Sequence, residues 1–221
     1  KNISGNKIIV DVAMNGEKFT TLDESERILP DDVLMINDAE KPIAIAGIMG
    51  GLNSEIRNDT NTVVIESASF DGNSIRNTSK KLNLRTEASS RYEKGIDPNL
   101  CELAADRVCR LVELLGAGNV LSGSIDIYPV PAIAKPVKAR VSRINHVLGI
   151  EATKEFMVSA LRSLEMKVES DGDIMLITPP TVRQDLIEEV DIIEEIARIF
   201  GYDKLPVTLP RSNTEAKEPA Q

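Results

Sequence analysis

A proline-rich segment in the middle of the chain constrains its fold more than any other feature. Three prolines fall within the eight residues from Pro129 to Pro136, and such a density keeps the backbone stiff and extended. Proline also lacks the N–H that helices and central strands need. We therefore expect two domains, residues 1–130 and 131–208, followed by a polar tail at 209–221 that we expect to be disordered.

The composition indicates a globular protein with an aliphatic core. The chain has 221 residues, of which 42% are apolar and only 3% aromatic. No run of about 18 apolar residues is present to span a membrane, and the first residues do not form a signal peptide. The abrupt start at Lys1, without Met, indicates an excised fragment.

The cysteines and the histidine exclude several kinds of site. Cys101 and Cys109 fall in an expected helix roughly 12 Å apart along its axis, which is too far for a disulfide. Two free thiols favour a reducing compartment, so we expect the protein in the cytoplasm. Because His146 is the only histidine, a His-rich zinc site is excluded and a Ser-His-Asp triad is disfavoured.

The first domain is expected to combine short strands with two helices. Asn15-Gly16 has the composition of a hairpin turn. One helix should run through Arg76–Lys81, capped by Asp71 or Asn73. A longer helix, Asn99–Leu115, shows apolar residues at helical spacing. Strand patterns cover residues 7–12, 19–22, 33–37, 42–48, 63–65 and 120–128.

The second domain is expected to be a small winged-helix-like module. This arrangement serves DNA binding and protein docking alike, so it does not decide function. The chain as a whole is predicted to be α+β, with a mixed sheet in the first domain. The expected order is helix Val141–Leu148, helix Thr153–Leu164, strand Lys167–Ser170, strand Ile174–Thr178 and helix Leu186–Phe200.

Polar residues in the first domain suggest a binding pocket. The stretch 85–97 combines charged and hydroxyl side chains with the turn residue Gly95. Glu66 stands in the apolar run 63–68, where an unpaired carboxylate is costly. The alternative is that it points outward or pairs with an arginine. Three glycines in 46–51 would let a ligand approach closely, or they form a plain turn after a strand.

Charge is distributed unevenly along the chain. A net charge of −9 argues against a general nucleic-acid binder. From Arg76 to Lys94, however, six basic residues stand against two acidic ones. That stretch could contact a phosphate backbone or be an ordinary solvated face.

Acidic residues near the C-terminus have a spacing that suits a cation. Asp191, Glu194 and Glu195 lie at i, i+3 and i+4 on one side of the expected helix, and Asp185 can fold back toward them. Carboxylate oxygens suit Mg²⁺. The alternative is the acidic outer face of an amphipathic helix. The opposite side would carry Ile187, Val190, Ile193, Ala197 and Phe200.

Three stretches of the first domain resemble the editing domain of the bacterial phenylalanine–tRNA ligase beta subunit. They are 42–51, 63–70 and 85–97. Residues 140–206 resemble the small domain that follows it, through Arg183-Gln184-Asp185 and the run 189–202. The resemblance covers nearly the whole chain, and the two motifs in this order are highly specific. One departure is Pro180-Thr181-Val182, where the family usually has Pro-Ser-aromatic.

This resemblance implies proofreading. A hydrophobic synthetic site rejects an added hydroxyl poorly, so in the family a second site hydrolyses tyrosine wrongly esterified to tRNA(Phe). The resemblance leaves the catalytic side chain unknown: a positioned water would attack the ester, helped by backbone donors and by the tRNA itself. Family members carry further pocket residues upstream, so we expect this pocket to be incomplete. The implied pocket residues are Gly47, Gly50, Glu66 as reader of the tyrosine hydroxyl, Thr86 and Ala88.

The resemblance also implies cofactors and partners. Mg²⁺ would bind at a site shared with the alpha subunit, and ATP would serve the whole enzyme without binding this fragment. The partners would be tRNA(Phe) and the alpha subunit, in a heterotetramer of two alpha and two beta subunits, with no membrane. The implied magnesium ligands are Asp185, Asp191, Glu194 and Glu195, and the candidate tRNA contacts are Lys80, Lys81, Arg85 and Arg91.

A non-catalytic function stays open beside editing. The chain could be a subunit-docking or tRNA-positioning module in which Glu66 and the basic stretch are structural.

Overall fold

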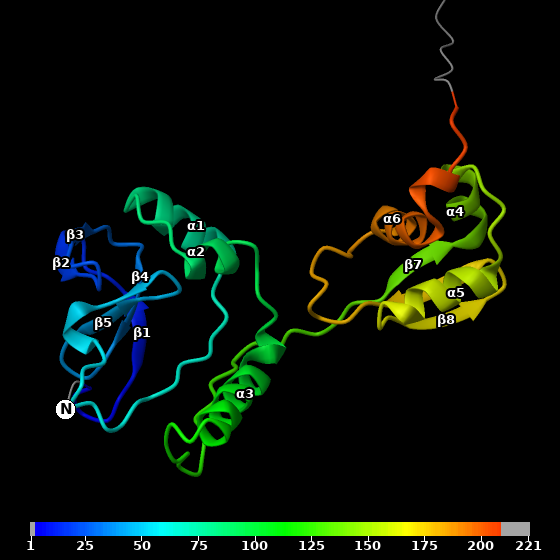
Figure 1. Cartoon of the computed structure of the whole chain (residues 1–221). Helices are drawn as coiled ribbons and strands as arrows, with labels where there is room; N and C mark the ends of the chain where they lie inside the picture. Colours follow the sequence, from blue (N-terminus) through cyan, green and yellow to red (C-terminus); the bar gives the residue numbers. More distant parts are fainter. Residues whose placement is uncertain (1–2, 209–221) are drawn as a thin grey trace, which may run out of the picture. The chain divides into compact units, whose positions relative to one another are not determined.

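Short antiparallel strands build the first part of the protein. The computed structural model describes residues 3–208, and the chain divides into two units, Lys1–Ala132 and Ile133–Gln221. The tail predicted to be disordered, 209–221, lies outside the described residues. In the first unit, β1-β4-β5-β6 form one sheet and β2-β3 another. The strands are β1 Ile9–Val12, β2 Glu17–Thr20, β3 Glu26–Leu29, β4 Leu34–Asn37, β5 Pro42–Ile45 and β6 Met49–Gly50 (Figure 1).

The turn at Asn15-Gly16 is present, but it does not join a hairpin. Gly16 has a φ of +81°, and its N–H donates to Leu29 O at 2.9 Å. Strand β1 pairs with β4, where Val10 lies opposite Ile36, while β2 pairs with β3. The hairpin prediction was therefore wrong. Local composition specifies the bend, whereas long-range packing selects the partner of each strand.

Two short helices follow, α1 (Gly72–Lys81) and α2 (Glu87–Tyr92). The predicted cap of α1 is confirmed, because the Asp71 side chain accepts a hydrogen bond from Ser74 N at 2.7 Å. Helix α2 was not predicted. Ile75 of α1 is 1% exposed and packs into the core of the strands. The other buried members of that core are Ala13, Phe19, Leu29, Val33, Met35, Ile45, Ile48 and Leu84.

Helix α3 (Cys101–Leu114) was predicted correctly from its periodicity. It follows a 3-10 turn at Pro98–Leu100, which Asp97 caps by accepting a hydrogen bond from Asn99 N. None of the residues of α3 is buried, and Leu103 is 65% exposed. The helix forms as its amphipathic pattern predicts, but no described residues cover its apolar face.

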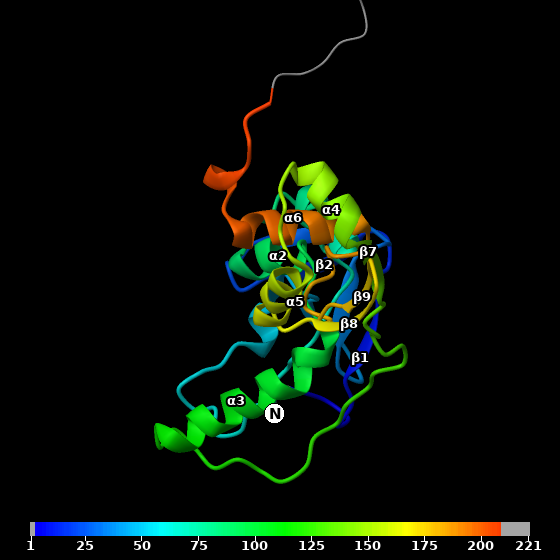
Figure 2. The ribbon, with the colours of Figure 1, turned by 90° about the vertical axis from the view of Figure 1, so that its right-hand side faces the viewer.

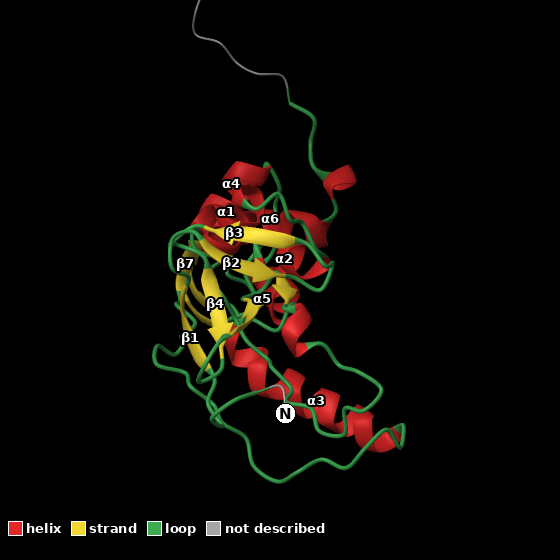
Figure 3. Ribbon diagram, turned by 90° about the vertical axis from the view of Figure 1, so that its left-hand side faces the viewer, coloured by secondary structure: helices red, strands yellow, loops and turns green. Residues whose placement is uncertain are grey.

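Two of the predicted strands are wrong. Residues 63–65 and 120–128 run as loop, and long loops flank α3 in Figure 3. Val64 is 69% exposed and Ile125 is 95% exposed. β-Branched residues favour strands, but a strand also needs a hydrogen-bonding neighbour, and no described strand pairs with either segment.

The second unit packs three helices on one face of an antiparallel sheet with the order β7-β9-β8. Figure 2 shows α4, α5 and α6 on the same side of these strands. Helices and sheets in both units confirm the predicted α+β class, and the strand β7 was not predicted. The elements are β7 Val137–Arg140, α4 Val141–Leu148, α5 Lys154–Ser163, β8 Lys167–Asp171, β9 Ile174–Thr178 and α6 Glu189–Phe200.

Local signals define the helix ends in this unit. The Thr153 side chain accepts a hydrogen bond from Phe156 N at 3.2 Å and caps α5. Gly149 ends α4 with a φ of +68°, a conformation that glycine adopts at helix C-termini. None of the described helices has the length and apolar character needed to cross a membrane.

Two isoleucines of β9 allow a test of whether the second sheet is buried on one face only. Ile177 is fully buried, whereas Ile174 in the same strand is 41% exposed. We expect Ile177→Ala to lower the free energy of unfolding of this unit by about 2–5 kcal/mol, because a buried side chain is lost and a cavity remains. Ile174→Ala should cost less than about 1 kcal/mol. Hydrogen exchange of the core amides measures both values, and equal losses would contradict one-sided packing.

Candidate functional site

Apolar side chains tightly enclose the glycine turn after β5. Gly47 has a φ of +65°, and a Cβ there would lie 2.9 Å from both Ile75 Cδ1 and Phe70 Cδ2. The same Cβ would lie 3.3 Å from Tyr92 Cδ2. The rings of Phe70 and Tyr92 pack edge to face with centroids 5.0 Å apart. Glycine is needed here both for its backbone conformation and because its neighbours leave no room for a side chain.

The side chain of Thr86 ties helix α2 to this turn. Thr86 Oγ1 donates to Ile48 O at 2.9 Å and accepts from Ser89 N at 3.1 Å. Ser89 Oγ in turn accepts from Thr86 N at 2.9 Å, which completes a capping box. Two of the predicted pocket residues, Gly47 and Thr86, are therefore brought together, and Ala88 is half-buried in the first turn of α2.

Glu66 lies on the loop that leads to Phe70, and not in a strand as predicted. The residue as a whole is exposed, yet partial burial of its carboxyl raises its pKa above the usual value. The pKa of Tyr92 is also raised, chiefly by burial and next by the negative charge of Glu66. The Glu66 carboxyl is therefore close enough to Tyr92 to influence it. Ser69 anchors this loop by donating from Oγ to Ile96 O at 2.9 Å.

Gly50, also predicted to line the pocket, faces Leu22. It belongs to β6, where it lies opposite Ala44. Its carbonyl accepts a hydrogen bond from Leu22 N at 3.0 Å, and a Cβ would lie 3.1 Å from Leu22 Cδ1. Sequence reasoning missed the apolar wall around Gly47. The one indication of this wall in the sequence was the aromatic residue Tyr92 within the polar stretch 85–97.

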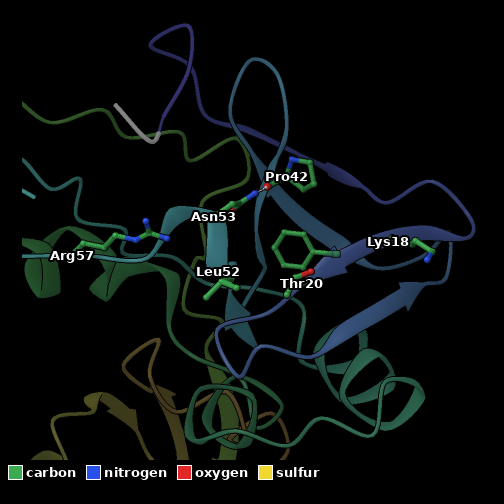
Figure 4. A pocket seen from close by; sticks show the side chains of 7 residues that line it. Lys18, Thr20, Pro42, Leu52, Asn53 and Arg57 are labelled. Carbon is green, nitrogen blue, oxygen red and sulfur yellow. Dashed lines mark hydrogen bonds between the residues drawn. The ribbon is translucent and has the colours of Figure 1, made fainter. Parts of the chain in front are cut away.

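An open hollow of about 540 Å³ lies elsewhere in the first unit (Figure 4). Asn53 Nδ2 donates to Pro42 O at 3.0 Å on its wall. The lining includes none of the predicted pocket residues. It also has no carboxylate, thiol or imidazole, so it offers no acid–base pair. The lining residues are Lys18, Phe19, Thr20, Pro42, Leu52, Asn53 and Arg57.

The basic residues predicted to contact tRNA are all exposed, but most are paired. Lys80 has no ion-pair partner within residues 3–208, and neither has Arg76, one turn earlier on the exposed side of α1. These two charges, one turn apart on α1, are therefore available to a phosphate. The three ion pairs are Lys81 with Asp32, Arg85 with Glu93 at 3.5 Å, and Arg91 with Glu87 at 3.4 Å.

Arg183 joins two of the four carboxylates predicted to bind magnesium. Its Nη2 lies 2.6 Å from Asp185 Oδ2 and 3.0 Å from Glu195 Oε1. Arg198 Nη2 donates to the second oxygen of Glu195 at 2.5 Å. These guanidinium groups, Arg183 foremost, hold the pKa of Glu195 below its usual value.

The other two carboxylates point elsewhere. Asp191 Oδ2 accepts hydrogen bonds from Ile187 N at 2.9 Å and Glu188 N at 2.7 Å. This cap makes α6 start at Glu189, and not at Leu186 as predicted. Glu194 is exposed. Residues 3–208 contain no group of three or more Asp, Glu, His or Cys side chains that could hold a metal ion.

The predicted division of α6 into an acidic and an apolar side was partly wrong. Glu195 is only 7% exposed, whereas Val190, placed on the apolar side, is 58% exposed. Ile192 and Ile196 are the fully buried positions. Since three of the four carboxylates are committed to arginine or to backbone N–H groups, the arrangement does not fit the octahedral oxygen shell of Mg²⁺. A magnesium ion here stays a prediction.

Gly47 and Gly16 form a matched pair for testing the enclosed turn. Both have positive φ, but nothing lies within 4 Å of a Cβ at Gly16. Gly16→Ala should therefore cost only the backbone strain, about 1–2 kcal/mol. Gly47→Ala should cost about 1–3 kcal/mol more, because its neighbours must shift. Unfolding measured on both variants checks this, and equal costs would show that the turn is not enclosed.

Comparison with protein families gives a match for each unit. Residues 1–117 match the family described as B3/4 domain, which is more than half of the chain. Residues 137–202 match the family described as tRNA synthetase B5 domain.

The chain is also similar to curated proteins over nearly all of its length. It is 48% identical over 209 residues to the phenylalanine–tRNA ligase beta subunit of Clostridium tetani, covering 95% of this chain and 26% of that protein. It is 50% identical over 214 residues to that of Clostridium acetobutylicum, covering 97% and 27%. The chain thus spans about a quarter of the length of these relatives.

Among solved structures, the chain is similar to an N-terminal fragment of the phenylalanyl-tRNA synthetase beta-subunit from Pyrococcus horikoshii. It has 14% sequence identity and a TM-score of 0.46, and the match covers 89% of this chain and 56% of that one. The family models, each matching the greater part of one unit, are the stronger finding. On that ground the chain belongs to the B3/4 domain family and continues into a tRNA synthetase B5 domain.

Proposed function

We propose that the chain is part of a phenylalanine–tRNA ligase beta subunit whose first unit edits tRNA(Phe), hydrolysing the ester of wrongly attached tyrosine. The observation that carries this proposal is the enclosed turn at Gly47, to which Thr86 ties α2 and near which the Glu66 carboxyl lies. Similarity to ligase beta subunits over 95–97% of the chain supports the same assignment.

Glu66 would distinguish tyrosine from phenylalanine. An ionised carboxylate accepts a charge-assisted hydrogen bond from a phenol, and phenylalanine has no hydroxyl to donate. A site built to bond a hydroxyl discriminates strongly against the analogue that lacks it. Phe70, Ile75 and Tyr92 around the turn offer apolar surface on which an aromatic ring can pack.

Hydrolysis would proceed by attack of water on the ester, without a covalent enzyme intermediate. Of the two cysteines, Cys101 is the one that interacts with Tyr92 at this site. Burial, Asp126 and Asp97 raise the pKa of Cys101 itself, so it stays a thiol and a poor nucleophile. The ester needs only a positioned water and donors for the oxyanion, and we assign no catalytic side chain.

The aminoacylation steps would be carried out by the complete ligase, of which this chain is a part. We propose that the alpha subunit and tRNA(Phe) are partners of the complete cytosolic enzyme, and that ATP is used outside this chain. Editing then acts on tRNA delivered from the aminoacylation site.

Deacylation of tyrosyl-tRNA(Phe) by the complete two-subunit ligase tests Glu66 directly. Glu66→Ala should lower the ratio of tyrosyl- to phenylalanyl-tRNA hydrolysis by about 10- to 100-fold, the worth of one hydrogen bond to a charged group. Glu40→Ala removes an exposed carboxylate of the same unit and serves as the control. An unchanged ratio in Glu66→Ala would show that this side chain does not read the hydroxyl.

The pH dependence of the same ratio gives a second readout of Glu66. Its folded pKa is raised above the usual 4.5, so as pH falls it protonates earlier than an ordinary glutamate. The ratio should therefore fall as pH drops through a window above 4.5. Glu66→Gln cannot titrate and should show no such fall. Effects of pH on ester hydrolysis itself cancel in the ratio.

The second candidate function, tRNA positioning without catalysis, is favoured by one observation. Arg76 and Lys80 are exposed on α1, and no carboxylate within the described residues pairs with them. Unpaired cations on one helix face can release counterions from a phosphate backbone.

Salt dependence of tRNA binding tests these two charges. Replacing both Arg76 and Lys80 by Gln should reduce the slope of log affinity against log salt by about 1.4–1.8. The matched control replaces Lys81 and Arg91, whose charges Asp32 and Glu87 already balance, and should change the slope less. If positioning is the sole function, the first variant should leave deacylation of bound tRNA intact. An unchanged slope would exclude this contact.

A further inference from the structure

The connection between β9 and α6 holds an ion-pair cluster that the editing proposal does not use. We propose that the guanidinium group of Arg183 takes the place of a divalent cation between Asp185 and Glu195. In this chain Arg183 and its two carboxylates then form a self-contained cluster, which we call the Arg183 clasp, and it does not bind magnesium. The inference is independent of what the first unit does.

Every oxygen of the two carboxylates is engaged in the clasp. Arg183 Nε lies 2.9 Å from Asp185 Oδ1, and Nη2 lies 2.6 Å from Oδ2. The same Nη2 donates to Glu195 Oε1 at 3.0 Å, and Arg198 Nη2 donates to Oε2 at 2.5 Å. A planar guanidinium fits a carboxylate with two parallel hydrogen bonds, so the geometry is the one that arginine favours.

Burial explains why the clasp needs a positive charge. Glu195 is 7% exposed, and a buried carboxylate must be paired with an opposite charge. Arginine holds its proton under all ordinary conditions. A Mg²⁺ on the same oxygens would stand within a few ångström of this fixed charge, and the repulsion between the two cations would be severe. Only one of them can occupy the position.

The clasp also fixes the course of the chain into α6. Arg183 and Asp185 lie in the loop, whereas Glu195 lies in the middle of the helix. Arg183 N donates to Pro180 O at 2.9 Å, and Leu186 beside the clasp is buried in the core. A loop held to the helix in this way does not require a metal ion to order it.

The test compares magnesium binding to the whole 221-residue chain and to an arginine variant. With wild type, MgCl₂ titrated by calorimetry should give no saturable binding, and Tm should follow a sodium chloride control of equal ionic strength. Arg183→Met keeps an unbranched stem about as long as the Cβ to Nε part of arginine and removes the guanidinium group with its charge. It should lower Tm without divalent cations and gain saturable Mg²⁺ binding at least about tenfold tighter than wild type. Added Mg²⁺ should then recover part of the lost Tm.

Arg198→Met is the matched control. It also removes a partner of Glu195, but it leaves the Arg183 clasp in place, so it should gain no magnesium binding. One-to-one binding of Mg²⁺ to wild type that Asp185→Asn abolishes would overturn the proposal, and so would equal affinities of wild type and Arg183→Met. If Arg183→Met does not fold, the same titration is made on the complete two-subunit ligase and its Asp185→Asn variant, where a site shared with the alpha subunit would also be present. Magnesium binding that Asp185→Asn abolishes would overturn the proposal there, and its absence would support it.

Discussion

One hydrogen bond, from Thr86 Oγ1 to Ile48 O, joins the two parts of the chain that form the candidate pocket. The residues are 38 positions apart, and the bond measures 2.9 Å. Helix α2 has only six residues, too few to be stable by itself, so it depends on its cap and on this contact. Because one hydroxyl both caps the helix and holds the turn, helix and turn keep a fixed relation. The enclosed side of Gly47 follows from that relation.

Ion pairs also join segments that are far apart in the sequence, as the hydrogen bond of Thr86 does. Arg183 reaches Glu195 over 12 positions and Lys81 reaches Asp32 over 49. Each such pair withdraws two charges from other use. Within the described residues, Arg76, Lys80 and Glu66 are among the charged side chains that no ion pair engages. In the first unit these three lie on or beside the helices and the turn of the candidate pocket, so they stay available to a ligand there.

The accuracy of the sequence predictions follows the range of the interactions behind each element. Helix α4 at Val141–Leu148 and strand β9 at Ile174–Thr178 match the predicted bounds, because caps, turns and periodicity act over a few residues. Segments 63–65 and 120–128 have strand composition but no pairing partner, and β3 (Glu26–Leu29) was missed although it has one. A strand exists only with its neighbour, which local composition does not specify.

The amino-acid sequence by itself determined the α+β class, most helix positions, the identity of the polar groups and the resemblance to a ligase subunit. Only the tertiary structure decided which of those groups meet. It enclosed Gly47 between Phe70, Ile75 and Tyr92, and it set Arg183 between two carboxylates that spacing alone had assigned to a metal. The reason is physical: a residue's type and spacing follow from the chain, whereas its partner depends on which distant segments pack against it.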